Sequence, residues 1–226
     1  MGVEFVLALL FDVNETLLDL SALDEPFTEF FGDPDARRAW FQSVLGTAMV
    51  VTAADSYVSF ADIGAAAITQ LARDRGLPLD GAIALAGRLR DLPPHPDVVP
   101  ALTLLANAGA RMATLTNSPG PVMHNQLRNA GLTDYFEAAI SCDQVGALKP
   151  APQPYHHAAD VLGLPIGDVT LVAAHGWDIY GAQRAGARGA FVARPGQRLL
   201  PVGQPSAFTG VDLLDVARQI IGTTVD

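Results

Sequence analysis

The sequence predicts an α/β protein, built as a doubly wound parallel sheet with a helical segment inserted after its first strand. Three observations predict this class. Residues 3–11 form a near-continuous apolar run, which is typical of a parallel strand covered on both faces. Residues 21–90 have no convincing strand, and from residue 97 onward strand-like and helix-like segments alternate.

The inserted segment has apolar residues at helical spacing. Trp40, Phe41, Val44 and Leu45 show this pattern, and it returns in Ile63 and the residues that follow. The segment ends at the run Leu-Pro-Pro-His-Pro, whose prolines stop a helix and stiffen a linker. We therefore expect a core made of residues 1–17 and 96–226, with residues 18–95 forming a helical cap.

The alternation after the linker gives the remaining elements of the core. Each helix is expected to cross over the sheet and lead into the next parallel strand. The tail after Leu200 shows little pattern apart from one last helix at 211–221. The expected helices are 97–107, 121–129, 152–162 and 179–185, and the expected strands are 111–116, 138–141, 169–174 and 189–193.

Composition narrows the classes of function. No stretch approaches the roughly 18 apolar residues that span a bilayer, and the N-terminus lacks the basic region of a secretion signal, so we expect a cytoplasmic protein and no membrane partner. The only cysteine, Cys142, excludes an intramolecular disulfide and is interpreted as a small buried hydrophobe. A net charge of −10 makes nucleic acid a poor partner.

Polar residues follow four of the expected strands. Asp12 to Thr16 comes after the first strand, Thr116 to Ser118 after the second, Lys149 after the third and residues 174–178 after the fourth. Taken singly, these residues suit helix caps, turns or an ordinary surface lysine. Because ligands bind outside the carboxyl ends of parallel strands, four such clusters at one edge predict a binding or catalytic site.

This ordered set resembles the haloacid dehalogenase superfamily. The resemblance rests on the loop Asp12-x-x-x-Thr16, on Thr116-Asn117, on Lys149 and on Asp178, and it covers nearly the whole chain. It implies a Rossmann-like core with a helical cap after the first loop. It also implies that the Asp12 carboxylate is the nucleophile.

Two positions indicate the branch of the superfamily. Its phosphatases carry a second Asp two residues after the nucleophile and a pair of acids that hold Mg²⁺, whereas this chain has Asn14 and Ala174. Asn is no acid, and Ala offers no oxygen ligand. The chain is more similar to the (S)-2-haloacid dehalogenases, which need no metal. The resemblance implies hydrolysis of a small anionic 2-haloacid through an ester on Asp12, no cofactor, and a homodimer whose interface the sequence does not reveal.

The resemblance also implies roles for the candidate residues. Lys149 holds Asp12 ionised, and Asp178 orients Lys149 or the attacking water. Thr16, Thr116 and Asn117 position the carboxylates. The substrate or halide site draws on seven further candidates: Arg37, Arg38, Asn14, Phe60, Tyr155, His175 and Trp177.

Several of these candidates keep an alternative. Arg37 or Arg38 is expected to meet the departing halide, but two arginines also suit a solvated helix face. Phe60 is expected on the pocket wall, although such a residue is more often core, and Tyr155 also suits plain packing. His175 is either a base or donor near the ester, or a neutral histidine bonded to a nearby loop.

The chain departs from the family pattern at the nucleophile loop and at the last loop. The family usually has Gly where Glu15 stands, and Gly adopts backbone angles that Glu resists. Ala173 and His175 replace Ser and Asn. Two other functions therefore stay open: a phosphatase or phosphonate-cleaving relative, and a non-catalytic protein that binds a small carboxylate.

Overall fold

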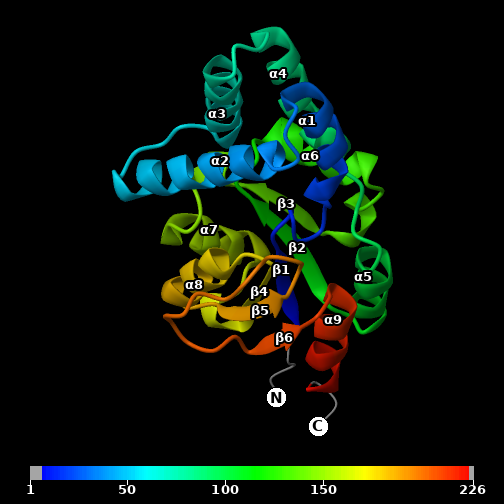
Figure 1. Cartoon of the computed structure of the whole chain (residues 1–226). Helices are drawn as coiled ribbons and strands as arrows, with labels where there is room; N and C mark the ends of the chain where they lie inside the picture. The colour runs from blue at the N-terminus through cyan, green and yellow to red at the C-terminus, as the bar shows by residue number, and fades with distance from the viewer. Residues whose placement is uncertain (1–6, 224–226) are drawn as a thin grey trace, which may run out of the picture.

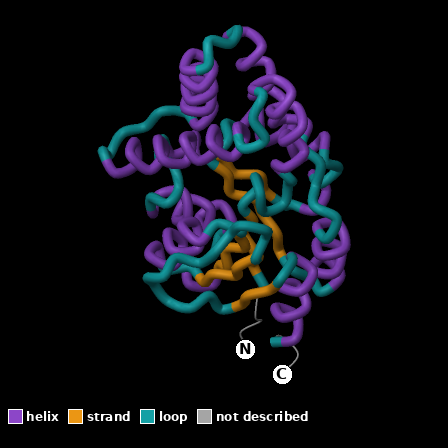
Figure 2. Tube along the Cα trace, viewed as in Figure 1, coloured by secondary structure: helices purple, strands orange, loops and turns teal. Residues whose placement is uncertain are grey.

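The computed structural model describes residues 7–223 of the chain, and its centre is a six-stranded parallel sheet. The strand order is β3-β2-β1-β4-β5-β6, with helices on both faces (Figures 1 and 2). The predicted α/β class, a Rossmann-like doubly wound sheet, is confirmed. The order runs outward from β1 in both directions, so the chain reverses its course across the sheet between β1 and β4, where such folds open a crevice.

The first strand lies in the middle of the sheet. All of its residues are buried, and Leu10 is in register with Ala113 on one side and Leu171 on the other. Burial on both faces explains why this strand reads as an unbroken apolar run. The strands are β1 (Ala8–Phe11), β2 (Arg111–Thr116), β3 (Ala138–Ser141), β4 (Val169–Ala173), β5 (Arg188–Val192) and β6 (Phe208–Gly210).

Helices cover the two faces of the sheet. Helices α5 (Val98–Asn107) and α9 (Leu213–Gly222) pack together on one face, while α7 (Pro152–Leu162) and α8 (Gly176–Ala185) pack together on the other (Figure 1). Helix α6 (Gly120–Asn129) contacts β3. Short 3-10 turns join these elements: η3 (Thr133–Tyr135), η4 (Cys142–Val145) and η5 (Ile166–Asp168).

Some predicted bounds differ from the observed ones. Strand β1 begins at Ala8, and residues 3–6 of the predicted strand lie outside the described residues. Helix α8 begins at Gly176 instead of residue 179, which places Asp178 in its first turn. Strand β6 was not predicted, because it has three residues and only Gly210 is buried, so it has no apolar pattern to recognise.

The segment between β1 and α5 is helical and lies over the carboxyl ends of the strands (Figure 1). Its longest helix buries Trp40, Phe41 and Val44, and the Trp40 indole N–H donates to the Gly64 carbonyl at 3.0 Å. This bond ties the longest helix to the next one. The elements are η1 (Leu20–Leu23), α1 (Asp24–Phe31), α2 (Ala36–Ala53), α3 (Phe60–Asp74), α4 (Leu79–Ala86) and η2 (Gly87–Asp91).

The two connections between this helical segment and the sheet run side by side. The Asp19 N–H donates to the Pro93 carbonyl at 2.8 Å, and the His95 N–H donates to the Leu17 carbonyl at 2.9 Å. The proline-rich linker thus pairs with the end of the loop after β1. In the part of the chain that the structure describes, no helix is both long and apolar enough to cross a membrane.

Candidate active site

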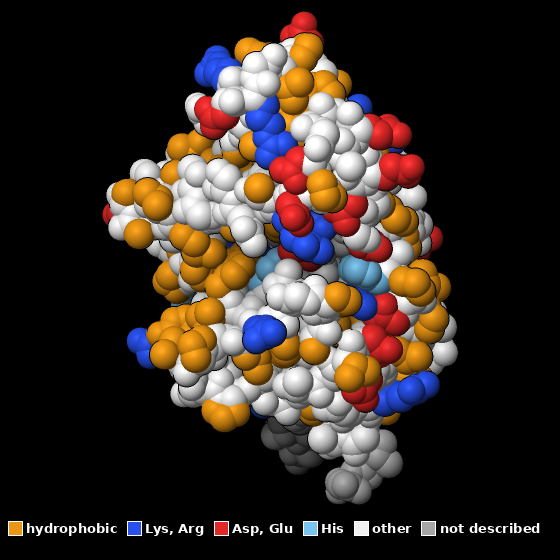
Figure 3. All heavy atoms as spheres, viewed as in Figure 1, with side chains coloured by type: hydrophobic (Ala, Val, Ile, Leu, Met, Phe, Trp, Pro, Cys, Tyr) orange, Lys and Arg blue, Asp and Glu red, His pale blue; other side chains and the backbone are white. Residues whose placement is uncertain are grey.

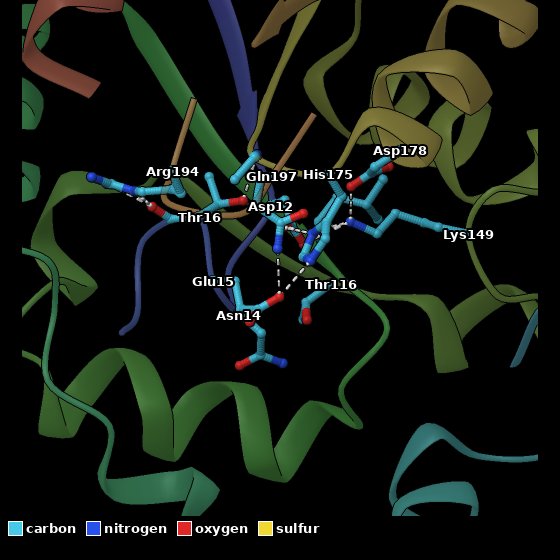
Figure 4. Close-up of polar contacts among 12 residues, drawn as sticks. Asp12, Asn14, Glu15, Thr16, Thr116, Lys149, His175, Asp178, Arg194 and Gln197 are labelled. Carbon is cyan, nitrogen blue, oxygen red and sulfur yellow. Dashed lines mark hydrogen bonds and ion pairs between the residues drawn. The ribbon is translucent and has the colours of Figure 1, made fainter. Parts of the chain in front are cut away.

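The candidate site lies at the carboxyl ends of β1, β2 and β4. Asp12 follows β1 directly, and its N–H donates to the Val172 carbonyl at 3.1 Å, which extends the pairing of β1 with β4. Thr116 ends β2, and His175 follows β4. The polar residues predicted at one edge of the sheet are therefore neighbours in space (Figure 4).

The Asp12 carboxylate is buried and accepts three hydrogen bonds. Thr16 Oγ1 donates to Oδ2 at 2.6 Å, Lys149 Nζ donates to Oδ1 at 2.9 Å, and His175 Nδ1 lies 3.2 Å from Oδ2. Burial alone would raise the pKa of Asp12, but the charge of Lys149 and the bonds from His175 and Thr16 outweigh it and hold that pKa well below its usual range. Asp12 is therefore an ionised carboxylate.

Lys149 is the only lysine of the chain, and it joins two carboxylates. Its side chain is 1% exposed, and Nζ donates to Asp178 Oδ2 at 2.6 Å and to the Leu115 carbonyl at 3.0 Å, besides Asp12. Burial lowers the pKa of Lys149, but the two carboxylates outweigh it and raise that pKa above its usual value. Lys149 is therefore a fixed cation between Asp12 and Asp178.

Tyr155 supports Asp178 from the other side. Its hydroxyl donates to Asp178 Oδ1 at 2.6 Å, and both side chains are fully buried. Gly181 makes this approach possible, because a Cβ at that position would lie 2.7 Å from the Tyr155 hydroxyl and 2.6 Å from Pro150 Cβ. Tyr155 thus orients Asp178, which in turn orients Lys149.

Thr16 connects the loop after β1 to the loops after β4 and β5. Its hydroxyl accepts a bond from the Ala174 N–H at 2.9 Å while it donates to Asp12. Its carbonyl accepts from Arg194 Nη2 at 2.9 Å, and Arg194 Nη1 pairs with Asp97 at 2.7 Å. The sequence interpretation missed Arg194, although this residue directly follows the expected strand 189–193 and the same rule about strand ends points to it.

Glu15 has a backbone that L-residues rarely adopt, with a φ of 61°. This left-handed conformation costs a non-glycine residue about 1–2 kcal/mol. Three contacts hold its side chain: His175 Nε2 lies 2.9 Å and Gln197 Nε2 3.0 Å from Oε2, and Arg37 Nη1 lies 3.4 Å from Oε1. The loop therefore has the left-handed conformation that favours glycine, and the glutamate side chain reaches the site.

His175 bridges Asp12 and Glu15, one from each ring nitrogen. Burial lowers the pKa of His175, but the hydrogen bonds and charges of these two carboxylates outweigh it and raise the pKa to about 9. The ring is thus an imidazolium that donates from both nitrogens. Two carboxylate partners favour this charged ring over the neutral histidine that the sequence leaves open as an alternative.

The loop after β2 lies on the side of Asp12 opposite to the loop after β4, because β2 and β4 flank β1 in the sheet. Asn117 Oδ1 accepts from the Lys149 N–H at 2.8 Å, and Thr116 Oγ1 accepts from the Ser118 N–H at 3.1 Å. The Asn14 amide is bonded at both ends: Nδ2 donates to Ser118 Oγ at 3.1 Å and Oδ1 accepts from Gln126 at 2.9 Å. Asn14 therefore ties the loop after β1 to the loop after β2 and to helix α6.

A cavity of about 20 Å³ lies above Asp12, which is room for about one water molecule. A polar groove of about 560 Å³ adjoins it, and His175 and Trp177 line both spaces. Figure 3 shows histidine side chains in a hollow on this face, with basic and acidic side chains beside it. The small cavity is lined by Asp12, Asn14, Phe41, Leu45, Phe60, Thr116, Asn117, Lys149, His175 and Trp177.

The two candidate arginines of the helical segment differ in placement. Arg37 is buried and pairs with Asp24 at 2.7 Å and with Glu15 at 3.4 Å. Arg38 is 68% exposed and pairs with Asp35 at 3.3 Å. Both line the polar groove, and neither lines the small cavity above Asp12. The structure thus brings Arg37 to the edge of the site through Glu15 and leaves Arg38 near the surface.

Comparison with known proteins gives the family. The model of the haloacid dehalogenase-like hydrolases matches residues 6–186. The chain belongs to this family. This hydrolase is 29% identical to the haloacetate dehalogenase H-2 of Moraxella sp. (strain B) over 218 residues, which cover 95% of the chain and 97% of that protein. It is 30% identical to the (S)-2-haloacid dehalogenase of Xanthobacter autotrophicus over 206 residues, which cover 85% of the chain and 77% of that protein.

A solved structure agrees with the sequence comparisons. The L-2-haloacid dehalogenase of Xanthobacter autotrophicus superposes with a TM-score of 0.89 at 25% identity, and the match covers 96% of the hydrolase and 99% of that chain. The family resemblance seen in the sequence is thereby confirmed.

The residues around Asp12 do not fit a magnesium ion. Mg²⁺ requires oxygen ligands, but the nearest donors to Asp12 are an ammonium, an imidazolium and a hydroxyl that already donates to it. Ala174 contributes its N–H to Thr16 and offers no side-chain oxygen. Among residues 7–223, no group of three or more His, Cys, Asp or Glu side chains is arranged to hold a metal ion.

Proposed function

We propose that this hydrolase converts small 2-haloalkanoic acids to 2-hydroxy acids through a covalent ester on Asp12. One observation carries the proposal: a buried, ionised carboxylate lies at the bottom of a small cavity and is held there by Lys149, Thr16 and His175. The names of the two similar enzymes, a haloacetate dehalogenase and an (S)-2-haloacid dehalogenase, support the substrate class.

The first step is a displacement at C2 of the substrate. An Asp12 oxygen forms a bond to C2 while the carbon–halogen bond breaks, and the halide leaves with the bonding electrons. Halide needs no proton when it leaves, so this reaction does not require a general acid at position 14, where the chain has Asn. Burial strips the carboxylate of water, and Lys149 keeps it ionised.

The second step is hydrolysis of the ester. Water attacks the Asp12 carbonyl carbon, the bond between that carbon and the substrate oxygen breaks, and the 2-hydroxy acid leaves. Asp12 returns to its carboxylate form, and one proton is released for each halide. Thr16 donates to one Asp12 oxygen and Lys149 to the other, so the donor at the oxygen that stays unalkylated is in place to stabilise the oxyanion of the tetrahedral intermediate.

Two donors in the cavity suit the substrate. Trp177 Nε1 is buried without a hydrogen-bond partner among the described residues, and a buried donor of this kind favours an anion such as the departing halide. Asn117 uses its oxygen to hold Lys149, which leaves its NH₂ group as a donor for the substrate carboxylate. Phe41, Leu45 and Phe60 supply the apolar wall.

The helical segment contributes part of this cavity, and we propose that it acts as a cap. Phe41 and Leu45 belong to α2 and Phe60 begins α3, whereas Asp12 and Lys149 belong to the sheet and its loops. The proposed division is a core of residues 1–17 and 96–226 and a cap of residues 18–95. Asp12 would then face a lid that excludes water during the displacement.

The test follows halide release from 2-chloropropionate by the parent protein and by Asp12→Asn. The parent is expected to release chloride, and the variant to release none above background. In a single turnover in oxygen-18 water, mass spectrometry should find the label in the peptide that contains Asp12. A second arm offers a phosphate monoester with Mg²⁺. Chloride release by Asp12→Asn, or turnover of the phosphate ester alone, would overturn the proposal.

A further inference from the structure

Glu15 and His175 are two positions at which the chain departs from the family pattern, and the structure brings them together. His175 Nε2 lies 2.9 Å from Glu15 Oε2, although 160 residues separate the two in the sequence. The other ring nitrogen, Nδ1, lies 3.2 Å from Asp12 Oδ2. A single imidazole therefore joins the nucleophile to a second carboxylate, and Figure 4 shows the three side chains in one group.

Glu15 is fixed in the orientation that this contact requires. Gln197 Nε2 donates at 3.0 Å to the same Glu15 oxygen that meets His175, and Arg37 lies 3.4 Å from the other oxygen. Glu15 thus has a partner on each oxygen from a different element. A carboxylate held in this way sets the orientation of the histidine ring and favours a proton on Nε2.

The ring itself is enclosed. His175 is 4% exposed, and the Trp177 ring lies 5.2 Å away at an interplanar angle of 31°. The Phe41 ring lies 6.5 Å away on α2. His175 lines the cavity above Asp12, which has room for about one water molecule. Nδ1 therefore faces the reacting carboxylate in a place where a single water fits.

The protonation of His175 depends on the charge of Asp12. In the free protein, burial lowers the pKa of His175, but Asp12 and Glu15 outweigh it and raise that pKa to about 9. An ester on Asp12 is neutral, so His175 then keeps one anionic partner instead of two and its pKa falls. The charged groups around the ring and its partners are Asp12, Glu15, Lys149, Arg37 and Asp178.

We propose that His175 is the general base that activates water for hydrolysis of the Asp12 ester, with Glu15 as the residue that positions it. The inference rests on the proposed function, because it requires an ester on Asp12. After the ester forms, His175 releases its Nδ1 proton to solvent. The neutral ring then takes a proton from the attacking water, and the hydroxide adds to the Asp12 carbonyl carbon.

The remaining bonds and protons balance. The tetrahedral intermediate breaks its bond to the substrate oxygen, and that oxygen takes the proton of the added hydroxyl group to become the 2-hydroxy acid. Asp12 is again a carboxylate and His175 again an imidazolium. One water is consumed, and one halide and one proton are released in each cycle. Alkylation of Asp12 itself thus converts the histidine from a donor to the carboxylate into a base.

The main test uses His175→Asn with 2-chloropropionate in a rapid-quench experiment. Asparagine keeps a short N–H donor near Asp12 but takes up no proton. We expect one equivalent of chloride per protein in a fast burst, followed by hydrolysis slowed by about 100-fold or more. Intact-protein mass spectrometry should then find the ester on most of the variant, whereas the parent accumulates little of it.

Glu15→Gln supplies a second, independent measurement. Without the Glu15 charge, the pKa of His175 in the ester state falls further, so the acid limb of the hydrolysis rate should move to lower pH. Weaker orientation of the ring should also slow hydrolysis. A purely structural role of Glu15 would leave the position of the acid limb unchanged. Arg128→Met, which removes an exposed charge on α6, is the control and should behave as the parent does.

The outcomes separate the inference from the proposed function. If the parent forms no ester and releases no halide, the proposed function fails. If the parent forms the ester and His175→Asn hydrolyses it as fast, only the base role fails. Loss of the chloride burst in His175→Asn alone would assign His175 to the first step and would also overturn the inference. If His175→Asn does not fold, the pH profile of Glu15→Gln decides.

Discussion

Lys149 gives the sharpest test of how the site keeps Asp12 ionised. The substitution Lys149→Met removes the ammonium and keeps a side chain of similar length. It leaves Asp12 and Asp178 buried without the cation that lies 2.9 Å from one and 2.6 Å from the other. Asp12 keeps its contact with His175, but the two buried carboxylates lose the cation that they share, so the pair binds a proton more readily and the nucleophile is lost in part of the molecules.

The structure sets the size of this effect. At 2.9 Å and an effective dielectric constant of about 20, the gross attraction between Lys149 and Asp12 is about 6 kcal/mol, which is an upper limit. Removal of one preorganised polar group from an active site costs about 2.7–4 kcal/mol in practice. We therefore expect the rate of ester formation to fall by about 100-fold to 1000-fold. Loss of one partner from a buried ion pair also destabilises the fold, by about 3–5 kcal/mol.

The assay measures the burst of chloride from 2-chloropropionate, which reports ester formation, across the acidic and neutral range at a temperature where both proteins are folded. In the parent, the pKa of Asp12 is far below its usual value, so ester formation persists into acid. In Lys149→Met the pKa of the carboxylates rises, and the acid limb should move to higher pH. Arg128→Met is the matched control for loss of a cation. A variant that keeps more than about a tenth of the parent rate, with an unmoved acid limb, would refute the reasoning.

Three further predictions concern stability, measured by denaturant unfolding. The pKa of His175 is raised from 6.5 to about 9, so its contribution to the free energy of unfolding is present below pH 6.5 and is lost as the pH rises through about 9. We expect the parent to lose up to about 3 kcal/mol over this range and His175→Asn to lose none of it. An equal loss in the variant would contradict this. Arg37→Ala should cost about 1.5–3 kcal/mol because it removes a buried cation that pairs with both Asp24 and Glu15, whereas Arg38→Ala should change stability by less than about 1 kcal/mol. Equal effects would speak against the placement of the two arginines. Tyr155→Phe removes the hydroxyl that lies 2.6 Å from Asp178 and should cost about 1.5–3 kcal/mol, so an unchanged free energy of unfolding would show that this bond contributes nothing.

Local patterns in the sequence determined much of the fold and the location of the site. The bounds of β2, β3 and α7 agree with the predicted ranges, because buried strands and amphipathic helices each have a characteristic spacing of apolar residues in the sequence. The rule that parallel strands end at one edge of the sheet predicted that Asp12 and Lys149 lie close together, and they are 2.9 Å apart.

Only the tertiary structure decided which partners these side chains have. The sequence indicates a backbone conflict at Glu15, and the structure shows that its side chain is a hydrogen-bond partner of His175, in the loop that follows β4. Arg37 was equivalent to Arg38 in the sequence, yet one is buried against Glu15 and the other is exposed. The physical reason is that the charge state of a buried group depends on what lies within a few ångströms of it, and residues far apart in the chain supply those neighbours only after folding.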